Sequence, residues 1–296
     1  MHGAFALDQG LAVLFGVATA VSNGVAVTTQ HIASTRSGQR LRGWALAVHL
    51  FRQPLWLFGW VALTGSLVFQ ALALHFGPMS EVQPILVSEL VVALLLRRFW
   101  IRQSIRAETW IAAGLTCVGL ATFLIAVSPS GQSLVPSTST WTGPVVLSAG
   151  GAAVLVLGAL RGSPSRRAGL LGAATGVLWA LEATFIKATT DVLASSGFVA
   201  TLERWPFYAF VVGGVFGLFC EQAALHVGPL KVSQPFIVIV DPVLSVVLGV
   251  WLYSEHLRAG LVVNLVGWLG FVVMCGGVVS LNQSSPSTMT PEPPHA

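Results

Sequence analysis

Charged residues are scarce in this sequence. Only 9% of its 296 residues are Asp, Glu, Lys or Arg, whereas an ordinary soluble domain has roughly 25%. Hydrophobic residues make up 54% of the chain, and they form runs of about 20 residues, the length of an α-helix that crosses the hydrocarbon core of a bilayer. The composition therefore excludes a soluble globular domain and predicts a membrane protein with several spans.

Cysteine is also scarce, which argues against disulfides and cysteine-based metal sites. The three cysteines, Cys117, Cys220 and Cys275, lie far apart, each within an apolar run. No pair has the close spacing of a zinc or redox motif. We expect all three to act as small buried hydrophobic residues.

Motifs for nucleotide binding and catalysis are missing. No glycine-rich phosphate loop and no soluble domain can be recognised, so neither ATP-driven pumping nor a cofactor is expected. Ser254, Glu255 and His256 are adjacent in sequence, but neighbouring helical positions point about 100° apart and cannot converge on one atom. The net charge of +4 comes from arginines in short loops, which does not indicate nucleic-acid binding. We therefore expect no enzyme, and partners limited to the bilayer, a small solute or ion, and a second copy if the protein forms a homodimer.

Apolar runs bounded by Pro, Gly and charged residues predict nine transmembrane helices. The first, 10–30, has no Lys or Arg before it, unlike a cleavable signal peptide, so we expect it to be retained. Segment 44–51 is too short to cross the bilayer, and we interpret it either as an interfacial helix or as part of an extra span. The other predicted spans are 54–74, 78–97, 108–127, 141–160, 168–188, 206–226, 229–251 and 260–281.

Lys and Arg are distributed unevenly between the two sides of this arrangement. Twelve fall on one side and three, Lys187, Arg204 and Arg258, on the other. Because cytoplasmic loops carry the excess of basic residues, the sequence predicts an inner-membrane (plasma-membrane) protein with its N-terminus outside and its C-terminus in the cytoplasm. We expect Lys187 to extend its amino group to the outer membrane interface.

The sequence contains an internal repeat. Nine of the 24 residues in 73–96 are identical to those 151 positions later, in 224–247, and 16–19 resemble 172–175, at an offset of 156. The predicted fold is therefore an all-α polytopic membrane protein with two four-helix repeats joined by one central helix. Four spans return a chain to its starting side, so the extra span inverts the second repeat, as in many secondary transporters.

The corresponding division of the chain has five parts. Segment 1–9 is an extracytoplasmic N-terminal segment, 10–127 the first repeat, 128–167 a linker that contains the fifth transmembrane helix, and 168–281 the second, inverted repeat. Segment 282–296 is rich in Ser, Thr and Pro and is predicted to be a disordered cytoplasmic tail.

The second repeat resembles the drug/metabolite transporter (EamA-like) superfamily. The resemblance lies in ALHVGP at 224–229, Asp241-Pro242 in the next span, and YSEHL at 253–257, which is similar to the family's G-E-x-L helix end. In the first half, Gln103-Ser104 stands where that glutamate signature would be. The resemblance covers both halves, roughly 10–281, and implies a secondary transporter that moves small solutes by alternating access. RQPLWLFG at 52–59 is similar to the NIPA-type magnesium transporter branch, which implies a divalent cation as the substrate.

Four acidic residues within predicted spans are the main candidates for substrate or ion binding: Asp241, Glu89, Glu182 and Glu221. A charged side chain at mid-bilayer costs about 2.5 to 3.5 kcal/mol on insertion scales, so these groups should face the bundle interior or a wet cavity. There they could bind a cation, or exchange a proton and so couple flux to the proton gradient. Asp241 is the strongest candidate, because Pro242 leaves a backbone carbonyl unpaired one turn earlier. Structural hydrogen bonding is the alternative role for each.

Amide side chains form a second set of candidates. Gln83 and Gln234 are repeat counterparts, each directly before a proline in the first turns of a span, and Gln70 aligns with Glu221. Asn23 lies within the first span, where polar residues commonly bridge helices. No catalytic residues are predicted, and no ligand set for a metal can be assigned.

Three functions fit these features. The leading hypothesis is a secondary transporter of the drug/metabolite type. Within it, a magnesium or other divalent-cation transporter and a proton-coupled drug or metabolite exporter are both open, since magnesium needs only one or two carboxylates. A non-transporting accessory protein of the membrane is the remaining alternative.

Overall fold

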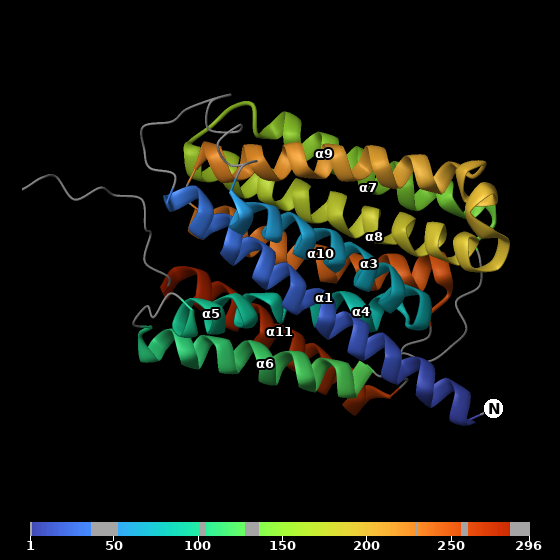
Figure 1. The fold of residues 1–296 in the computed structure, drawn as a ribbon, viewed down its shortest axis with the longest axis horizontal. Helices are drawn as coiled ribbons and strands as arrows, with labels where there is room; N and C mark the ends of the chain where they lie inside the picture. Colours follow the sequence, from blue (N-terminus) through green and yellow to red (C-terminus); the bar gives the residue numbers. More distant parts are fainter. Residues whose placement is uncertain are drawn as a thin grey trace, which may run out of the picture.

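The computed structural model describes residues 2–36, 53–100, 105–127, 136–228, 230–255 and 260–284. All regular structure in these residues is α-helical, and the helices run roughly along one common direction (Figure 1). The predicted segment 44–51, Gln103-Ser104 and residues 285–296 lie outside the described residues. The helices are α1 His2–Arg36, α3 Pro54–Phe76, α4 Met79–Leu86, α5 Glu89–Phe99, α6 Ala107–Val127, α7 Thr138–Gly158, α8 Pro164–Leu202, α9 Trp205–Val227, α10 Leu230–Tyr253 and α11 Leu261–Ser284.

The polarity of the bundle is that of a membrane protein. Nine stretches of the described chain are long and apolar enough to cross a bilayer, and α4 and α5 together form one of them. Large apolar side chains such as Phe219 and Leu261 lie on the outside, 73% and 78% exposed, whereas Glu81, Lys187 and Glu255 are buried. This confirms the predicted polytopic helical membrane protein, because lipid replaces water as the solvent of the outer faces.

Proline and glycine residues set the ends of several helices. Proline occupies the first turn of α3, α8 and α9, where its missing amide hydrogen would have no helical partner anyway. The chain leaves α3 at Gly77 and enters α4 directly after Pro78. This tight turn brings the C-terminus of α3 and the N-terminus of α4 next to each other.

The third predicted span is broken rather than continuous. Between α4 and α5, the backbone amides of Val87, Ser88 and Leu90 each donate to the carbonyl three residues back, over 3.0–3.2 Å. This local 3₁₀ geometry interrupts the α-helical pattern. The break follows Pro84, whereas α10 continues through both Pro235 and Pro242. As a result, Glu89 becomes the first residue of a new helix.

Several helices are longer than predicted. α8 spans 39 residues, from Pro164 to Leu202, well beyond the predicted 168–188. Its last part follows Gly197, whose φ of 83° is readily adopted only by glycine. α1 begins at His2 and α11 continues to Ser284, so the predicted terminal segments 1–9 and 282–296 are helical wherever the structure describes them.

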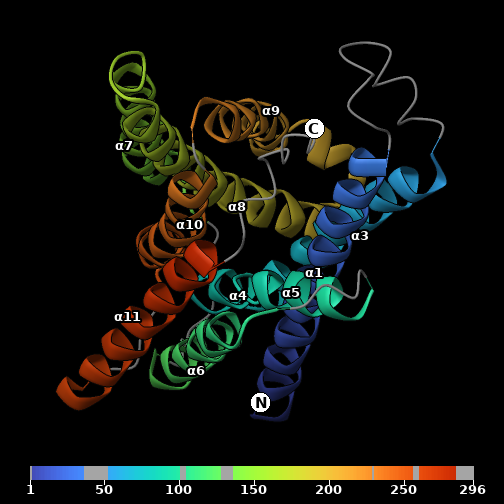
Figure 2. The same ribbon diagram turned by 90° about the vertical axis from the view of Figure 1, so that its left-hand side faces the viewer.

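The helices pack in two sets that meet at the centre of the bundle. In one set α1 contacts α3, α4 and α5; in the other α8 contacts α7, α9 and α10. The two sets meet where α10 contacts α4 and where α3 contacts α8. The remaining two helices, α6 and α11, contact each other, and α11 also contacts α10. Seen from the end, α4 and α8 lie in the middle of the bundle, and α10 lies at its edge between α7 and α11 (Figure 2).

α6 and α11 form a close antiparallel pair. A Cβ atom placed on Gly277 would touch Thr116, and one placed on Gly270 would lie 2.9 Å from the Cβ of Thr122. The earlier residue of α6, Thr116, thus faces the later residue of α11, Gly277, so the two helices run in opposite directions. Small residues at the crossing allow the two backbones to approach each other.

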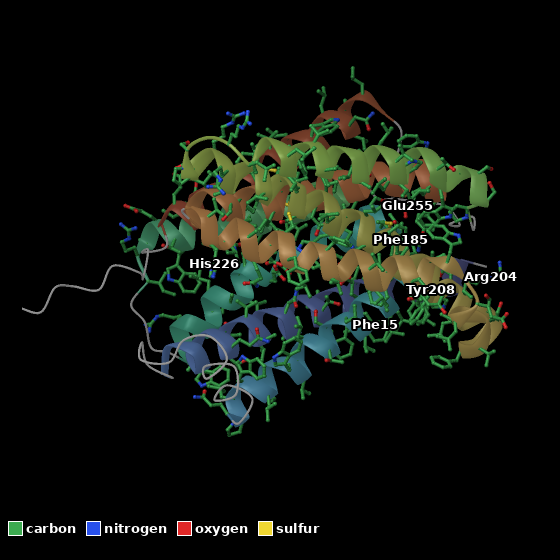
Figure 3. All side chains as sticks on the ribbon, turned by 90° about the horizontal axis from the view of Figure 1, so that it is seen from above. Phe15, Phe185, Arg204, Tyr208, His226 and Glu255 are labelled. Atoms are coloured by element: carbon green, nitrogen blue, oxygen red, sulfur yellow. The ribbon has the colours of Figure 1, made fainter. Side chains whose placement is uncertain are left out.

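An aromatic and aliphatic cluster fills the end of the bundle that carries the α3–α4 turn. We call this end the Gly77 end, and the opposite end, where α9 meets α10, the His226 end. Glu255 and Phe185 lie toward the first and His226 toward the second (Figure 3). Trp141 of α7 stacks on Phe185, with ring centroids 5.6 Å apart, and meets Trp205 edge-on at 5.1 Å. The Gly77 end is therefore tightly packed.

Candidate functional site

The four predicted acidic residues come from four different helices. Glu89 opens α5 and Glu221 lies in the last two turns of α9. Glu182 and Asp241 lie near the middle of α8 and α10. All four are buried or half-buried.

These carboxylates are close enough to interact electrostatically. Glu89 interacts with both Asp241 and Glu221, and Glu182 interacts with the same two residues. The structure therefore brings together acidic side chains that are up to 152 positions apart in the sequence (Glu89 and Asp241). Like charges in a shared interior repel each other, so this group can attract a cation or hold protons.

Two of the carboxylates accept a hydrogen bond from a neighbouring side chain. The Asn23 Nδ2 atom of α1 donates to Glu89 Oε2 over 2.7 Å, so Asn23 bridges α1 and α5 as expected for a polar residue inside a span. The hydroxyl of Ser245 donates to Asp241 Oδ1 over 3.1 Å. These bonds position the carboxylates of Glu89 and Asp241.

Glycine provides the space for Glu182. A Cβ atom on Gly214 of α9 would lie 2.7 Å from Glu182 Oε1, whereas one on the neighbouring Gly213 would have only ordinary contacts at 3.9 Å. The carboxylate of Glu182 therefore lies against the bare backbone of α9. The sequence predicted this glutamate as a candidate but gave no indication of the glycine beside it.

The predicted glutamines lie on α3, α4 and α10. Gln83 of α4 is 2% exposed and its Nε2 atom has no hydrogen-bond partner among the described residues. Gln234 and Gln70 are half-buried on α10 and α3. Among the described residues, the hydrogen bonds to these carboxylates come from Asn23 and Ser245 and not from the glutamines.

Lys187 is placed differently from the sequence-based prediction. Its side chain does not extend to the membrane interface but is 1% exposed. The amino group donates to the carbonyl oxygens of Leu74 over 2.5 Å and of Gly77 over 3.1 Å. The prediction was wrong because the last carbonyls of α3 lack helical partners and offer the ammonium group an interior site.

Glu255 completes a second contact at the same turn. Its carboxylate accepts hydrogen bonds from the backbone amides of Met79 and Ser80, over 2.6 and 3.0 Å, and from the Ser80 hydroxyl, over 2.7 Å. Glu255 is only 4% exposed. A lysine thus binds the C-terminus of α3 and a glutamate binds the N-terminus of α4. We call Lys187, Glu255 and the backbone groups that they bind the turn clamp.

Tyr253 lies beside Lys187 of the turn clamp. Its hydroxyl donates to the carbonyl of Thr184 over 2.7 Å, and the Lys187 amino group lies 5.4 Å from the centre of its ring. Nearby, His75 Nδ1 and Asp191 Oδ1 are 3.3 Å apart. From the sequence, YSEHL at 253–257 could be interpreted only as a family-like helix end. The one sequence feature that indicated the clamp was Lys187, a single lysine within an apolar run.

The described residues contain no group of three or more His, Cys, Asp or Glu side chains that could hold one metal ion. The carboxylate group therefore offers electrostatic attraction without a preformed metal cage. A hydrated divalent ion needs only one or two carboxylates, so the arrangement does not distinguish such an ion from a proton or an organic cation.

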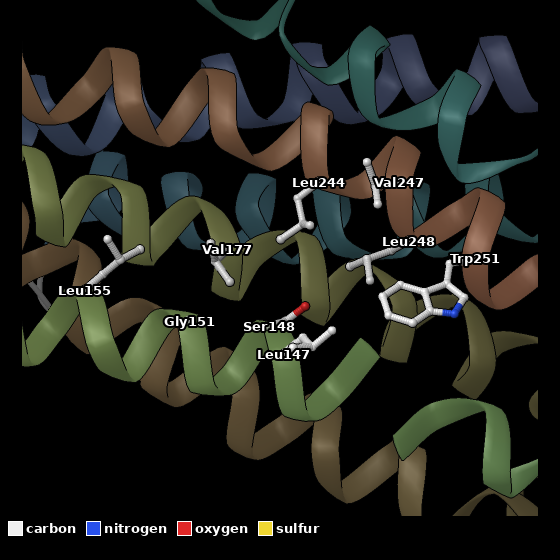
Figure 4. Close-up of a pocket in the computed structure, with 9 residues that line it drawn as sticks. All are labelled: Leu147, Ser148, Gly151, Leu155, Val177, Leu244, Val247, Leu248 and Trp251. Carbon is white, nitrogen blue, oxygen red and sulfur yellow. The ribbon is translucent and has the colours of Figure 1, made fainter. Parts of the chain in front are cut away.

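A recess of about 210 Å³ lies between α7, α8 and α10, and none of the four carboxylates lines it. Its walls are aliphatic and aromatic side chains, with Ser148 as the polar exception (Figure 4). One hydroxyl gives little means of holding a polar solute. The carboxylate group is therefore the better candidate site.

Comparison with known proteins gives one full-length relative of unassigned activity. An uncharacterized protein of Corynebacterium glutamicum is 25% identical to this chain over 291 residues, which cover 95% of this chain and 94% of that protein. No family model matches the chain, and no solved structure matches it. The similarity extends over nearly the whole chain. Because the relative is uncharacterized, it assigns no function to this chain.

Proposed function

We propose that this chain is a secondary transporter of the drug/metabolite type, which moves a small solute across the cell membrane by alternating access between two inverted repeats. The observation that carries the proposal is the group of four interacting carboxylates, one each from α5, α8, α9 and α10. Ionisable groups inside a membrane bundle mark solute or proton pathways. Both proposed repeats contribute to this group, as expected of a site at the interface between repeats.

The crossing of α6 and α11 supports the inverted relationship. Gly119 and Gly270 are 151 positions apart, as are Phe123 and Met274. A Cβ on Gly119 would meet the Met274 amide nitrogen and the Gly270 carbonyl, and a Cβ on Gly270 would meet the Phe123 amide nitrogen and the Gly119 carbonyl. Such reciprocal contacts arise where a two-fold axis relates two surfaces. Because the two helices are antiparallel, the axis lies across them, in the membrane plane.

The packing of the other helices fits the same axis. The contact of α1 with α3 corresponds to that of α8 with α9, and the contact of α1 with α4 and α5 corresponds to that of α8 with α10. One pair breaks the correspondence: α3 packs against α8, whereas α9 and α1 have no comparable contact in the described residues. The bundle is therefore closed more tightly at the Gly77 end.

The distribution of basic residues supports an orientation for this state. The Gly77 end lies on the side with three Lys and Arg residues, the other side having twelve, so the positive-inside rule places the Gly77 end outside. In this orientation the N-terminus is outside, the C-terminus is cytoplasmic, and the structure corresponds to the state closed toward the outside. The carboxylates favour a cationic solute, or a proton coupled to an organic solute.

The direct test is flux in proteoliposomes that contain both a pH-sensitive and a magnesium-sensitive dye. We expect a solute-dependent proton signal that Asp241→Asn and Glu89→Gln abolish and that Glu108→Gln retains. Glu108 is a matched control because it is exposed in the first turn of α6. A magnesium response that both central variants abolish would instead support the divalent-cation branch. No flux of any organic cation, amine, neutral metabolite or magnesium would overturn the proposal in favour of an accessory role.

A further inference from the structure

On the basis of the proposed function, we propose that the turn clamp is the gate at the Gly77 end. Lys187 and Glu255 hold this end shut in one conformation, and the opening of the Gly77 end to solute requires both residues to release the α3–α4 turn.

The charges of the clamp match the backbone groups that they bind. The C-terminus of a helix carries partial negative charge on its free carbonyls and the N-terminus carries partial positive charge on its free amides. Lys187 binds the first kind of group, at Leu74 and Gly77, and Glu255 binds the second kind, at Met79 and Ser80. Because both side chains are buried, these hydrogen bonds are weakened little by solvent.

Every bond of the clamp crosses between the two proposed repeats. The α3–α4 turn belongs to the first repeat, whereas Lys187 of α8 and Glu255 after α10 belong to the second. The 2.7 Å bond from Tyr253 to Thr184 stays within the second repeat, so Lys187 and Glu255 are tied to each other and can move together. Separation of the repeats at this end therefore breaks the clamp bonds as a set.

The opposite end of the bundle has the counterpart turn, but the sequence has no lysine or glutamate at the two counterpart positions. Gly228 packs against Pro164 and Ala168 of α8, just as Gly77 packs against Ala12 of α1, and the offsets of 151 and 156 match the repeat. At the same offsets, the counterparts of Glu255 and Lys187 in the sequence are Ser104 and His31. The amino-acid sequence thus provides the lysine–glutamate pair at one end only, which biases the resting protein toward closure at the Gly77 end.

The test measures distances between spin labels in lipid nanodiscs, in a background with Cys117, Cys220 and Cys275 replaced by alanine. One label pair, Val68→Cys with Leu193→Cys, reports on α3 and α8 near the Gly77 end. The other, Val27→Cys with Gln222→Cys, reports on α1 and α9 toward the His226 end. All four label sites are exposed on their helices, so labelling leaves the interior unchanged.

We expect Lys187→Met and Glu255→Gln each to raise the ratio of open to closed Gly77 ends by about tenfold or more. The α1–α9 distance should shorten in the same samples, because opening at one end accompanies closure at the other. Ser80→Ala removes a single clamp bond and should give a smaller shift in the same direction, which keeps the test valid if Lys187→Met fails to fold. Glu203→Gln is the matched control, since Glu203 is an exposed carboxylate between α8 and α9, and it should leave both distances unchanged.

Two results would overturn the inference. Unchanged α3–α8 distances in the folded clamp variants would show that the pair does not hold this end shut. A purely structural role would be shown by a different result: both the α3–α8 and the α1–α9 distance distributions broaden, the α1–α9 distance does not shorten, and the unfolding temperature falls. These readouts do not depend on flux, so a protein that transports nothing yet changes its distances as expected would refute the proposed function alone.

Discussion

The hydroxyl of Tyr253 donates to the carbonyl of Thr184 over 2.7 Å and so joins the last turn of α10 to the middle of α8. The other tyrosine of the chain, Tyr208, makes a bond of the same type, to the carbonyl of Leu202 over 2.8 Å, but at an exposed position. The two tyrosines thus make nearly identical bonds in opposite environments.

This pair gives a matched prediction for stability. Tyr253→Phe should lower the free energy of unfolding by about 1 kcal/mol, because the buried Thr184 carbonyl loses its second donor and water cannot replace it. Tyr208→Phe should have a much smaller effect, since water replaces the lost donor. Thermal unfolding in detergent measures both, and equal effects of the two substitutions would contradict the buried bond.

Glycines at the α6–α11 crossing should be irreplaceable. Gly119→Ala and Gly270→Ala each place a methyl group against the backbone of the other helix, and overpacking of this kind typically costs about 1–3 kcal/mol. Gly114→Ala and Gly276→Ala are the controls on the same two helices, because a Cβ there meets nothing within 4 Å. Unfolding temperatures that fall for the first two variants and not for the controls would support the close crossing. Similar temperatures for all four would argue against it.

Gly214→Ala should affect transport more than stability. The added methyl group would lie 2.7 Å from Glu182 Oε1, and a flexible carboxylate can move aside, which displaces it from the group of four. Gly213→Ala, one residue away, meets only ordinary contacts at 3.9 Å and should behave as the native chain. Initial flux rates and unfolding temperatures of the two variants separate these effects. Full flux in Gly214→Ala would mean that the position of Glu182 does not matter for transport.

The bond between Asn23 and Glu89 should appear as coupling between the two substitutions. Asn23→Ala removes the only described donor to Glu89 Oε2, and interhelical polar bonds in membranes contribute about 0.6 to 1.7 kcal/mol. In a double-mutant cycle, Asn23→Ala should therefore change the free energy of unfolding by one amount in the native chain and by a different amount in the Glu89→Gln variant. Asn264→Ala, at an exposed position of α11, should be additive with Glu89→Gln. Strict additivity of the Asn23 cycle would rule out a contribution of this bond.

Features that depend on composition and local sequence could be predicted. Nine spans follow from the length of apolar runs, and the part of the chain that the structure describes contains nine stretches able to cross a membrane. Glu89, Glu182, Glu221 and Asp241 could be singled out because ionisable groups are costly in a bilayer. Their role in binding stays a prediction, and the structure adds that they lie near one another.

Features that depend on contacts between distant segments could not be predicted. The amphipathic reach of a lysine side chain led to the interface prediction for Lys187, but its actual partners are carbonyls more than 100 positions away. The break at Val87–Ser88 was missed because no proline or glycine occupies it. Glu255 was noted only as part of a family-like pattern, since nothing in its local sequence points to the amides of α4.

The separation of the turn clamp along the chain has a consequence for the biogenesis of the protein. The α3–α4 turn is synthesised 110 residues before Lys187 and 175 residues before Glu255, counted from Gly77 and Ser80. While the ribosome makes these later segments, the backbone groups at the turn must find other partners, such as water at the membrane surface or an insertase. The first half can therefore enter its final position only after α10 has been inserted, and a truncated chain that ends before Glu255 should be recognised by membrane quality-control proteases as incompletely assembled.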